Sequence, residues 1–144
     1  MLFPHVVSTE ADKAFINVLN VQAATADAGD ALVWDTGTSN GVRVTQPVTG
    51  TLSLFVGVAD SAIAASAYGL VQAYGYRASA LIAGDTSITI AVGDILVPVN
   101  AADYVSYSKT STGLDGFIYN GASYGTVSTP ASVASLAAVF IRAL

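Results

Sequence analysis

The residues that could act as a serine nucleophile lie in one short motif. Gly121, Ser123 and Gly125 match the G-x-S-x-G pattern, in which the serine sits on a sharp turn between a strand and a helix. Such a serine needs a base within hydrogen-bonding reach, normally a histidine that follows it in the chain. The single histidine, His5, precedes it, and the segment after Gly125 does not read as a helix start. The motif is interpreted as a chance match, no catalytic residue is assigned, and the chain is not expected to be an enzyme.

Metal-binding residues are equally few. The chain has no cysteine and one histidine, which leaves carboxylates and a hard cation such as Ca²⁺. Asp27, Asp30 and Asp35 are close in sequence but lack the spacing of an EF-hand loop. The pairs Gly29-Asp30 and Gly93-Asp94 each precede an apolar run, which predicts a turn with a positive-φ glycine and an aspartate bonded to the backbone that follows. No metal or cofactor is predicted, although a cation held between subunits stays open as an alternative.

Partners that carry phosphate are not expected. The net charge is −5 and the sequence contains neither G-x-G-x-x-G nor G-x-x-x-x-G-K. Proteins that neutralise the phosphates of nucleic acid present clustered cations. The five cations of this chain are instead scattered along it, as Lys13, Arg43, Arg77, Lys109 and Arg142.

The composition indicates a surface that is short of charge. Apolar residues make up 53% of the chain and charged residues 10%, against about a quarter charged in ordinary globular domains. The surface is therefore either neutral, built from small residues, or partly buried against other protein, and we favour assembly into a homo-oligomer or larger particle. A membrane is not expected, because no run approaches the roughly 20 apolar residues of a spanning helix. The N-terminal residues do not read as a secretion signal.

Short apolar runs separated by Gly, Asp and Asn predict an all-β fold, a single compact β-barrel or β-sandwich with an extended N-terminal arm. Residues 1–13 form the arm and residues 14–144 the domain. Gly75 is expected to mark a bulge or bend, and the Ala-rich segments 61–67 and 130–138 have room for a short helical turn. The expected strands are 15–21, 31–34, 42–45, 51–58, 69–80, 87–90, 95–99, 104–107, 117–119 and 139–142.

Tyrosines are concentrated on two of these strands. Tyr68, Tyr74 and Tyr76 flank the longest one, and Tyr104 and Tyr107 lie on another. Aromatic side chains of this kind either pack in a core or protein interface, which is the commoner use, or stack against sugar rings.

Four segments carry a resemblance to a known family. Ser53–Asp60 (SLFVGVAD), Tyr68–Tyr76 (YGLVQAYGY), Ala91–Pro98 (AVGDILVP) and Val139–Leu144 (VFIRAL) resemble the capsid decoration, or cement, proteins of tailed bacteriophages. The resemblance extends over residues 15–144, and its motifs are structural rather than catalytic. The arm matches no pattern.

The resemblance implies a structural virion protein, made in the cytoplasm of a host bacterium and located on the outer capsid surface. It would bind an assembled icosahedral capsid, bridge neighbouring capsomers and stabilise the shell, with the major capsid protein and its own copies, as a dimer or trimer, for partners. We expect the arm to contact a neighbouring subunit, with addition of a strand to an exposed sheet edge as one way to do so. The alternatives are a glycan- or receptor-binding β-module on a virion fibre or tail, and a cellular carbohydrate-binding domain. The arm residues expected at the contact are Leu2, Phe3, Pro4, His5, Val6 and Val7.

Overall fold

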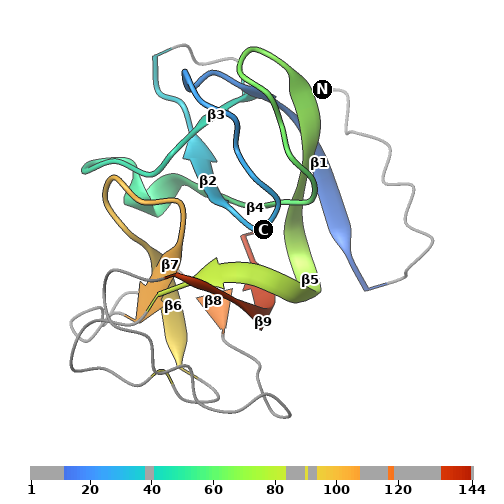
Figure 1. Cartoon of the computed structure of the whole chain (residues 1–144), viewed down its shortest axis with the longest axis vertical. Helices are drawn as coiled ribbons and strands as arrows, with labels where there is room; N and C mark the ends of the chain where they lie inside the picture. Colours follow the sequence, from blue (N-terminus) through green and yellow to red (C-terminus); the bar gives the residue numbers. More distant parts are fainter. Residues whose placement is uncertain are drawn as a thin grey trace.

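The computed structural model of the chain describes residues 12–37, 41–83, 90, 94–107, 117–118 and 134–143. These residues form β-strands and one short 3-10 helix, η1 (Leu52–Leu54), which confirms the predicted all-β fold (Figure 1). The strands are β1 (Ala14–Asn20), β2 (Ala31–Trp34), β3 (Arg43–Thr45), β4 (Phe55–Ala59), β5 (Tyr68–Ile82), β6 (Ile95–Pro98), β7 (Val105–Tyr107), β8 (Phe117–Ile118) and β9 (Ser135–Arg142).

The first five strands close into a β-barrel. Their hydrogen-bonded order is β1-β3-β2-β4-β5, and β5 pairs with β1 to complete the circuit. β1 and β3 are parallel, whereas the other neighbours are antiparallel. Side chains that alternate inward fill the barrel, as expected where one face of each strand is buried. The buried apolar residues of this core are Val18, Ala26, Leu32, Val44, Val56, Ala59, Ile63 and Val71.

The remaining strands complete a second circuit that shares β5 with the first. Its order is β5-β7-β6-β8-β9, with β9 pairing back to β5. β5 and β7 are parallel, and the other neighbours are antiparallel. Figure 1 shows β2, β3 and β4 beside one half of β5 and β6 to β9 beside the other half. A second core joins the second circuit to β2 and β4 of the first, and it is formed by Ala31, Val58, Ala80, Ile82, Ile90, Leu96, Val105, Val139 and Ile141.

The two circuits have the same topology. Strands β1 to β5 correspond one by one to β5 to β9, including the single parallel pair between the first and third strand of each set. The sequence keeps a trace of this repeat at the second strand of each set, where Asp30–Val33 (DALV) corresponds to Asp94–Val97 (DILV). The fold is therefore a tandem repeat of one five-stranded unit in which β5 is the last strand of one unit and the first of the next.

Gly75 lies where β5 passes from one circuit to the other. The residues before it pair with β1, and those after it pair with β9 as far as Ile82. Gly75 has φ +100°, and a Cβ atom at this position would collide with the backbone oxygen of Asp12. The bend predicted at this glycine is confirmed, because only glycine tolerates both the positive φ and the close approach of another backbone.

Two predictions of local structure were wrong, and a third does not hold for the described part of its segment. The segment 51–58 is not one strand: a turn held by hydrogen bonds among Val48, Thr51 and Leu54 replaces its first half, because the Thr51 hydroxyl bonds the backbone locally. Residues 61–67 form no helical turn, since Ile63 instead bridges Ala26. In the segment 130–138, residues 135–138 belong to β9, where pairing with β5 overrides the alanines' helix propensity.

Candidate interaction surface

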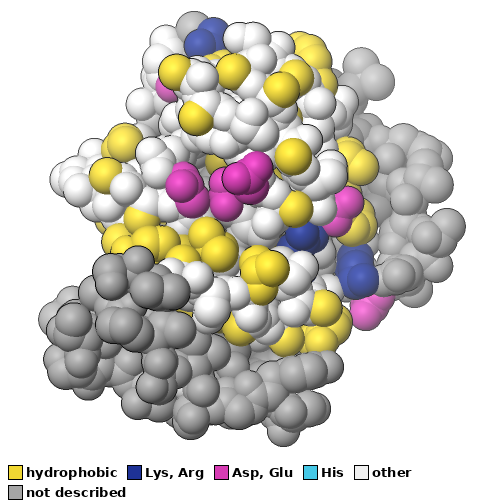
Figure 2. All heavy atoms as spheres, in the orientation of Figure 1, with side chains coloured by type: hydrophobic (Ala, Val, Ile, Leu, Met, Phe, Trp, Pro, Cys, Tyr) yellow, Lys and Arg dark blue, Asp and Glu magenta, His cyan; other side chains and the backbone are white. Residues whose placement is uncertain are grey.

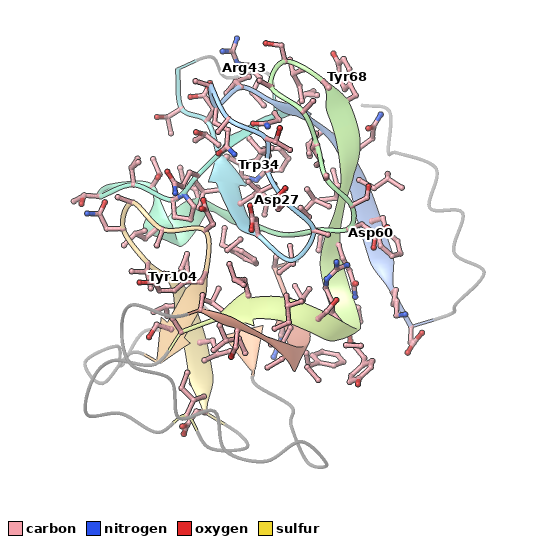
Figure 3. All side chains as sticks on the ribbon, in the orientation of Figure 1. Asp27, Trp34, Arg43, Asp60, Tyr68 and Tyr104 are labelled. Atoms are coloured by element: carbon pink, nitrogen blue, oxygen red, sulfur yellow. The ribbon has the colours of Figure 1, made fainter. Side chains whose placement is uncertain are left out.

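The outward face of β5 carries large apolar side chains that are exposed to solvent. Tyr68 is 64% exposed, Leu70 46% and Tyr74 39%, whereas Val71 and Ala73 between them are buried. Strand alternation explains the exposure of Tyr68 and Leu70 and the burial of Val71, because successive side chains point to opposite faces. Gln72, between Leu70 and Tyr74, is buried as well, where the pairing with β1 shifts register. Figure 3 labels Tyr68 near one end of β5. The first half of β5 therefore presents an apolar row to the outside.

Strands β1 and β9 widen this row on either side. On β1, Ile16 packs against the core and Val18 is buried, so that Phe15, Asn17 and Leu19 face outward. Leu19 pairs with Tyr68, and Asn17 pairs with Leu70. On β9, the ring of Phe140 meets that of Tyr74 edge to face, with centroids 5.3 Å apart. We call the whole set the apolar band; it consists of Phe15, Leu19, Tyr68, Leu70, Tyr74, Phe140 and, farther along β9, Leu136.

The band contains most of the exposed large apolar side chains among the described residues. Leu136 is 60% exposed and lies on the part of β9 that pairs with the second half of β5. Of the six such side chains, only Val48 and Ile95 lie elsewhere. Single exposed apolar residues need no explanation, but a contiguous group of them is typical of an interaction site. The band is therefore the strongest candidate for a functional surface in the described part of the chain.

Arg77 of β5 is turned away from this surface and buried. Its Nη1 donates to Asp60 Oδ1 at 2.9 Å, its Nη2 to the backbone oxygen of Ala59 at 2.9 Å, and its Nε to that of Ser79 at 2.9 Å. Asp60, labelled in Figure 3, lies at the end of β4 beside β5. The guanidinium thus fastens β4 to the centre of β5 and adds no exposed charge to the band.

The tyrosines whose side chains the structure describes do not gather at one place. Tyr68 and Tyr74 are six positions apart on one strand, which separates them by about 20 Å, too far for one sugar ring to contact both. Tyr76 and Tyr104 are half-buried. This arrangement favours an extended contact surface over a compact sugar-binding platform.

Two groups of residues that were candidates from the sequence are outside the described ranges. These are the predicted arm contacts from Leu2 to Val7, His5 among them, and the serine motif around Ser123. Phe15 and Leu136 were not singled out in advance. Phe15 lies in the predicted strand 15–21, but no role was predicted for its side chain. Leu136 lies in the segment 130–138, for which a helical turn was considered.

Two other kinds of feature, a metal-binding cluster and a membrane-spanning helix, are absent from the described residues. No group of three or more His, Cys, Asp and Glu side chains is placed to hold a metal ion. No helix in the same ranges is long and apolar enough to cross a membrane.

An acidic loop lies beside the part of the band that Leu136 forms, because a Cβ atom at Gly29 would be 3.0 Å from Leu136 Cδ2. Asp27, labelled in Figure 3, lies in the region where acidic side chains gather near the centre of the face in Figure 2. The backbone N–H of Asp27 donates to Asp30 Oδ2 at 2.7 Å, so the Asp30 side chain bonds the backbone that precedes it, not the backbone that follows as predicted. The positive φ predicted at Gly29 is confirmed at +100°. Burial, with a smaller effect of the neighbouring carboxylates of Asp103 and Asp27, raises the pKa of Asp30 to about 6.

We expect this carboxyl group to make the protein less stable as the pH rises. Because its pKa is 3.8 in the unfolded chain and about 6 in the folded protein, the folded state holds a proton that the unfolded state has released. Stability is therefore lost as the pH rises through this interval. Asp30→Asn keeps an acceptor for the Asp27 N–H and should raise the free energy of unfolding at pH about 7.5 by on the order of 2 kcal/mol, with little effect at pH about 4.

Urea unfolding at both pH values measures this difference. Asp12→Asn, which removes a carboxylate from an exposed residue, is the matched control and should show no comparable pH-dependent gain. An Asp30→Asn variant equally stable to the wild type at both pH values would contradict the prediction.

No family model matches this chain, and no curated protein matches it at a significant level. Its function is therefore inferred from its own residues and their geometry.

Proposed function

We propose that this chain is a capsid decoration protein: a structural virion protein that binds the outer surface of an assembled icosahedral capsid and bridges neighbouring capsomers. In this proposal the major capsid protein is the partner, and the mature protein resides on the virion surface. The resemblance of four segments to phage decoration proteins suggests the family, and the tandem repeat is the observation that carries the bridging role.

A fold of two like units that share one strand is suited to bridging two neighbouring capsid subunits. A capsid surface repeats identical subunits side by side, so a bridging protein meets the same surface twice. The two circuits of this fold have the same strand order and share β5. The outward faces at this shared strand both carry exposed apolar residues, Leu70 beside β1 and Leu136 on β9. Each unit can therefore contact one of two neighbouring subunits.

The chemistry of the band suits a contact with protein. Aromatic residues are enriched and most charged residues depleted at the centres of protein interfaces. The band is aromatic and aliphatic, and Arg142, opposite Tyr74, is the charged residue exposed on the same face of β9. A protein that binds only the assembled shell stabilises it by mass action, so that many copies with weak contacts suffice.

Pelleting with empty shells tests this proposal. The shells are assembled from the major capsid protein encoded in the same genome, expanded, and sedimented with the purified protein. Leu70→Asp and Leu136→Asp each place a charge in the band and should weaken binding at least about tenfold, or about 1.4 kcal/mol. Val48→Asp is the matched control, because Val48 is 43% exposed but lies outside the band.

The outcomes separate the proposal from its alternative. Wild-type protein and Val48→Asp in the pellet, with both band variants depleted, would support decoration. Wild-type protein that stays in the supernatant would contradict it, and binding of the isolated protein to a glycan array would favour the glycan-binding alternative.

A further inference from the structure

The acidic loop, residues 27–30, connects the two circuits of the fold. Within the first circuit, the Gly29 N–H donates to the backbone oxygen of Ala59 at 3.0 Å, and the Asp30 C=O accepts from the Ala59 N–H at 2.9 Å. Toward the second circuit, the Gly29 C=O accepts from the Leu81 N–H at 2.9 Å, on the half of β5 that pairs with β9. The loop is therefore bonded to both circuits at adjacent residues.

The connection between β6 and β7 meets this loop from the second circuit. The backbone oxygen of Asp103 accepts from the Ala31 N–H at 2.8 Å, directly after the acidic loop. The side chain of the same aspartate bonds the first circuit as well, because Asp103 Oδ1 accepts from Gln46 Nε2 at 2.6 Å. The carboxylate of Asp103 is thus held at the junction, where it raises the pKa of Asp30.

The Asp30 side chain is buried at this junction among other negative charges. The residue is 7% exposed, and its Oδ2 accepts from the Asp27 N–H at 2.7 Å. The charged groups that act on it are the carboxylates of Asp103, on the facing connection, and of Asp27, on its own loop. Ionisation of a buried carboxyl group is costly, and neighbouring negative charges increase the cost.

The cations of the strands packed against the loop do not offset this cost. β4 has no charged residue. β5 contributes Arg77, which donates to the same Ala59 oxygen as the loop does, but its Nη1 is paired with Asp60 Oδ1 at 2.9 Å. β9 contributes Arg142, its last residue, whereas the loop contacts the start of that strand, at Leu136. The described surroundings of the carboxyl group therefore favour its neutral form.

We propose that the acidic loop is a proton-operated latch between the two circuits, which holds Leu81 and Asp103 when the Asp30 side chain is protonated and releases them when it ionises. Release carries the new charge into water, where a carboxylate is most stable. It breaks the bonds of the loop alone, because β2 stays paired with β4 and both circuits keep β5. It also removes the contact of Gly29 with Leu136, at one end of the apolar band.

The latch is expected to be closed in mild acid and to open more often as the pH rises. The pKa of Asp30 is about 6 in the folded protein against an ordinary value of 3.8, so the closed form holds a proton that the open form has released. The equilibrium constant for opening should therefore rise at least about tenfold between pH about 4.5 and about 7.5. This inference does not depend on the proposed capsid role and is measurable without capsids.

Hydrogen exchange of single backbone amides, followed by NMR at both pH values, measures the opening. Protection is the factor by which structure slows exchange, so it is corrected for the pH dependence of exchange in an unstructured peptide. The amides of Ala31 and Leu81 are the reporters, because both donate across the junction. They should be less protected than the most protected amides of the first barrel, and their protection should fall at least about tenfold from pH about 4.5 to about 7.5. Reporters as protected as those amides at both pH values would overturn the proposal, because the loop would then open only with the whole fold.

Three variants test whether Asp30 is the group that operates the latch. Asp30→Asn keeps an acceptor for the Asp27 N–H and should abolish the pH dependence of both reporters. Asp103→Asn keeps an acceptor for Gln46 and removes one neighbouring charge, so it should reduce the dependence without abolishing it. Asp12→Asn, at an exposed residue, is the matched control and should leave the dependence unchanged. An unchanged pH dependence in Asp30→Asn would overturn the proposal.

A titration of the wild-type protein gives a test that needs no variant to fold. The NMR signal of the Asp30 carboxyl carbon and the amide signals of Ala31 and Leu81 should shift together, with a common midpoint at pH about 6. A carboxyl midpoint at the ordinary value of 3.8, or reporter amides that do not follow the carboxyl group, would contradict the latch.

Discussion

Replacing Arg77 with alanine is expected to lower the free energy of unfolding by about 3 kcal/mol. The guanidinium is 8% exposed and donates to side-chain or backbone oxygens of Ala59, Asp60, Gln72 and Ser79. Its removal leaves buried oxygens without this donor, and each unsatisfied buried group costs about 1–3 kcal/mol. The loss also detaches the end of β4 from the strand that both circuits share.

Urea unfolding monitored by circular dichroism measures this loss, and Arg43→Ala is the matched control. Arg43 pairs with Asp35 at 3.1 Å, but its side chain is 34% exposed. Exposed pairs of this kind contribute only about 0–1 kcal/mol. Equal effects of the two substitutions would show that burial of the Arg77 network does not stabilise the fold.

The second large effect is expected at the glycine where β5 changes circuits. Gly75→Ala should destabilise the protein by about 3 kcal/mol or more, because a positive φ costs a non-glycine residue about 1–2 kcal/mol and the methyl group also meets the backbone of Asp12. Relief of the collision requires β1 to move away from β5, which opens the first barrel.

Gly50→Ala separates the two causes. Gly50 has φ +93°, close to that of Gly75, but nothing lies within 4 Å of a Cβ atom there. Its substitution should cost about 1–2 kcal/mol, from the backbone strain alone. Thermal and urea unfolding of both variants measures the difference. If Gly50→Ala lowered the free energy of unfolding as much as Gly75→Ala, the close approach of Asp12 would contribute nothing to the cost of Gly75→Ala.

Local patterns predicted the bounds of two strands well, one a fully buried apolar run and the other a long strand. The apolar run Ala31–Trp34 is a strand with the predicted bounds, and the long strand at 69–80 extends only slightly farther, as Tyr68–Ile82. The alternation on this strand also explains why Tyr68 and Leu70 share an outward face. Prediction failed where local side-chain bonds or pairing with a distant strand decide the structure, as at Thr51 and in residues 135–138.

The tandem repeat could not be predicted from these patterns. Its sequence trace, the matching Gly-Asp pairs before Leu32 and Leu96, was interpreted as a shared turn type because little else in the two units is alike. The dual role of β5 depends on pairings with β1 and β9, which are far away in the sequence. Non-local pairing of this kind is set by the whole core and leaves no periodic signal in one segment.

The apolar band was only partly accessible from the sequence. The tyrosines suggested a contact surface, but whether they gather or spread depends on the bend at Gly75 and on the Tyr74–Phe140 contact across two strands. The shortage of charge predicted a surface that contacts other protein, but it did not predict where in the fold this surface lies.

Cryo-electron microscopy of the virus particle encoded with this chain tests the central claim most directly. The proposed function predicts density for the two joined units on the outer capsid surface, between neighbouring capsomers, with Leu70 and Leu136 facing the shell. Density confined to the tail or fibres, or particles that contain the protein nowhere on the capsid, would contradict it.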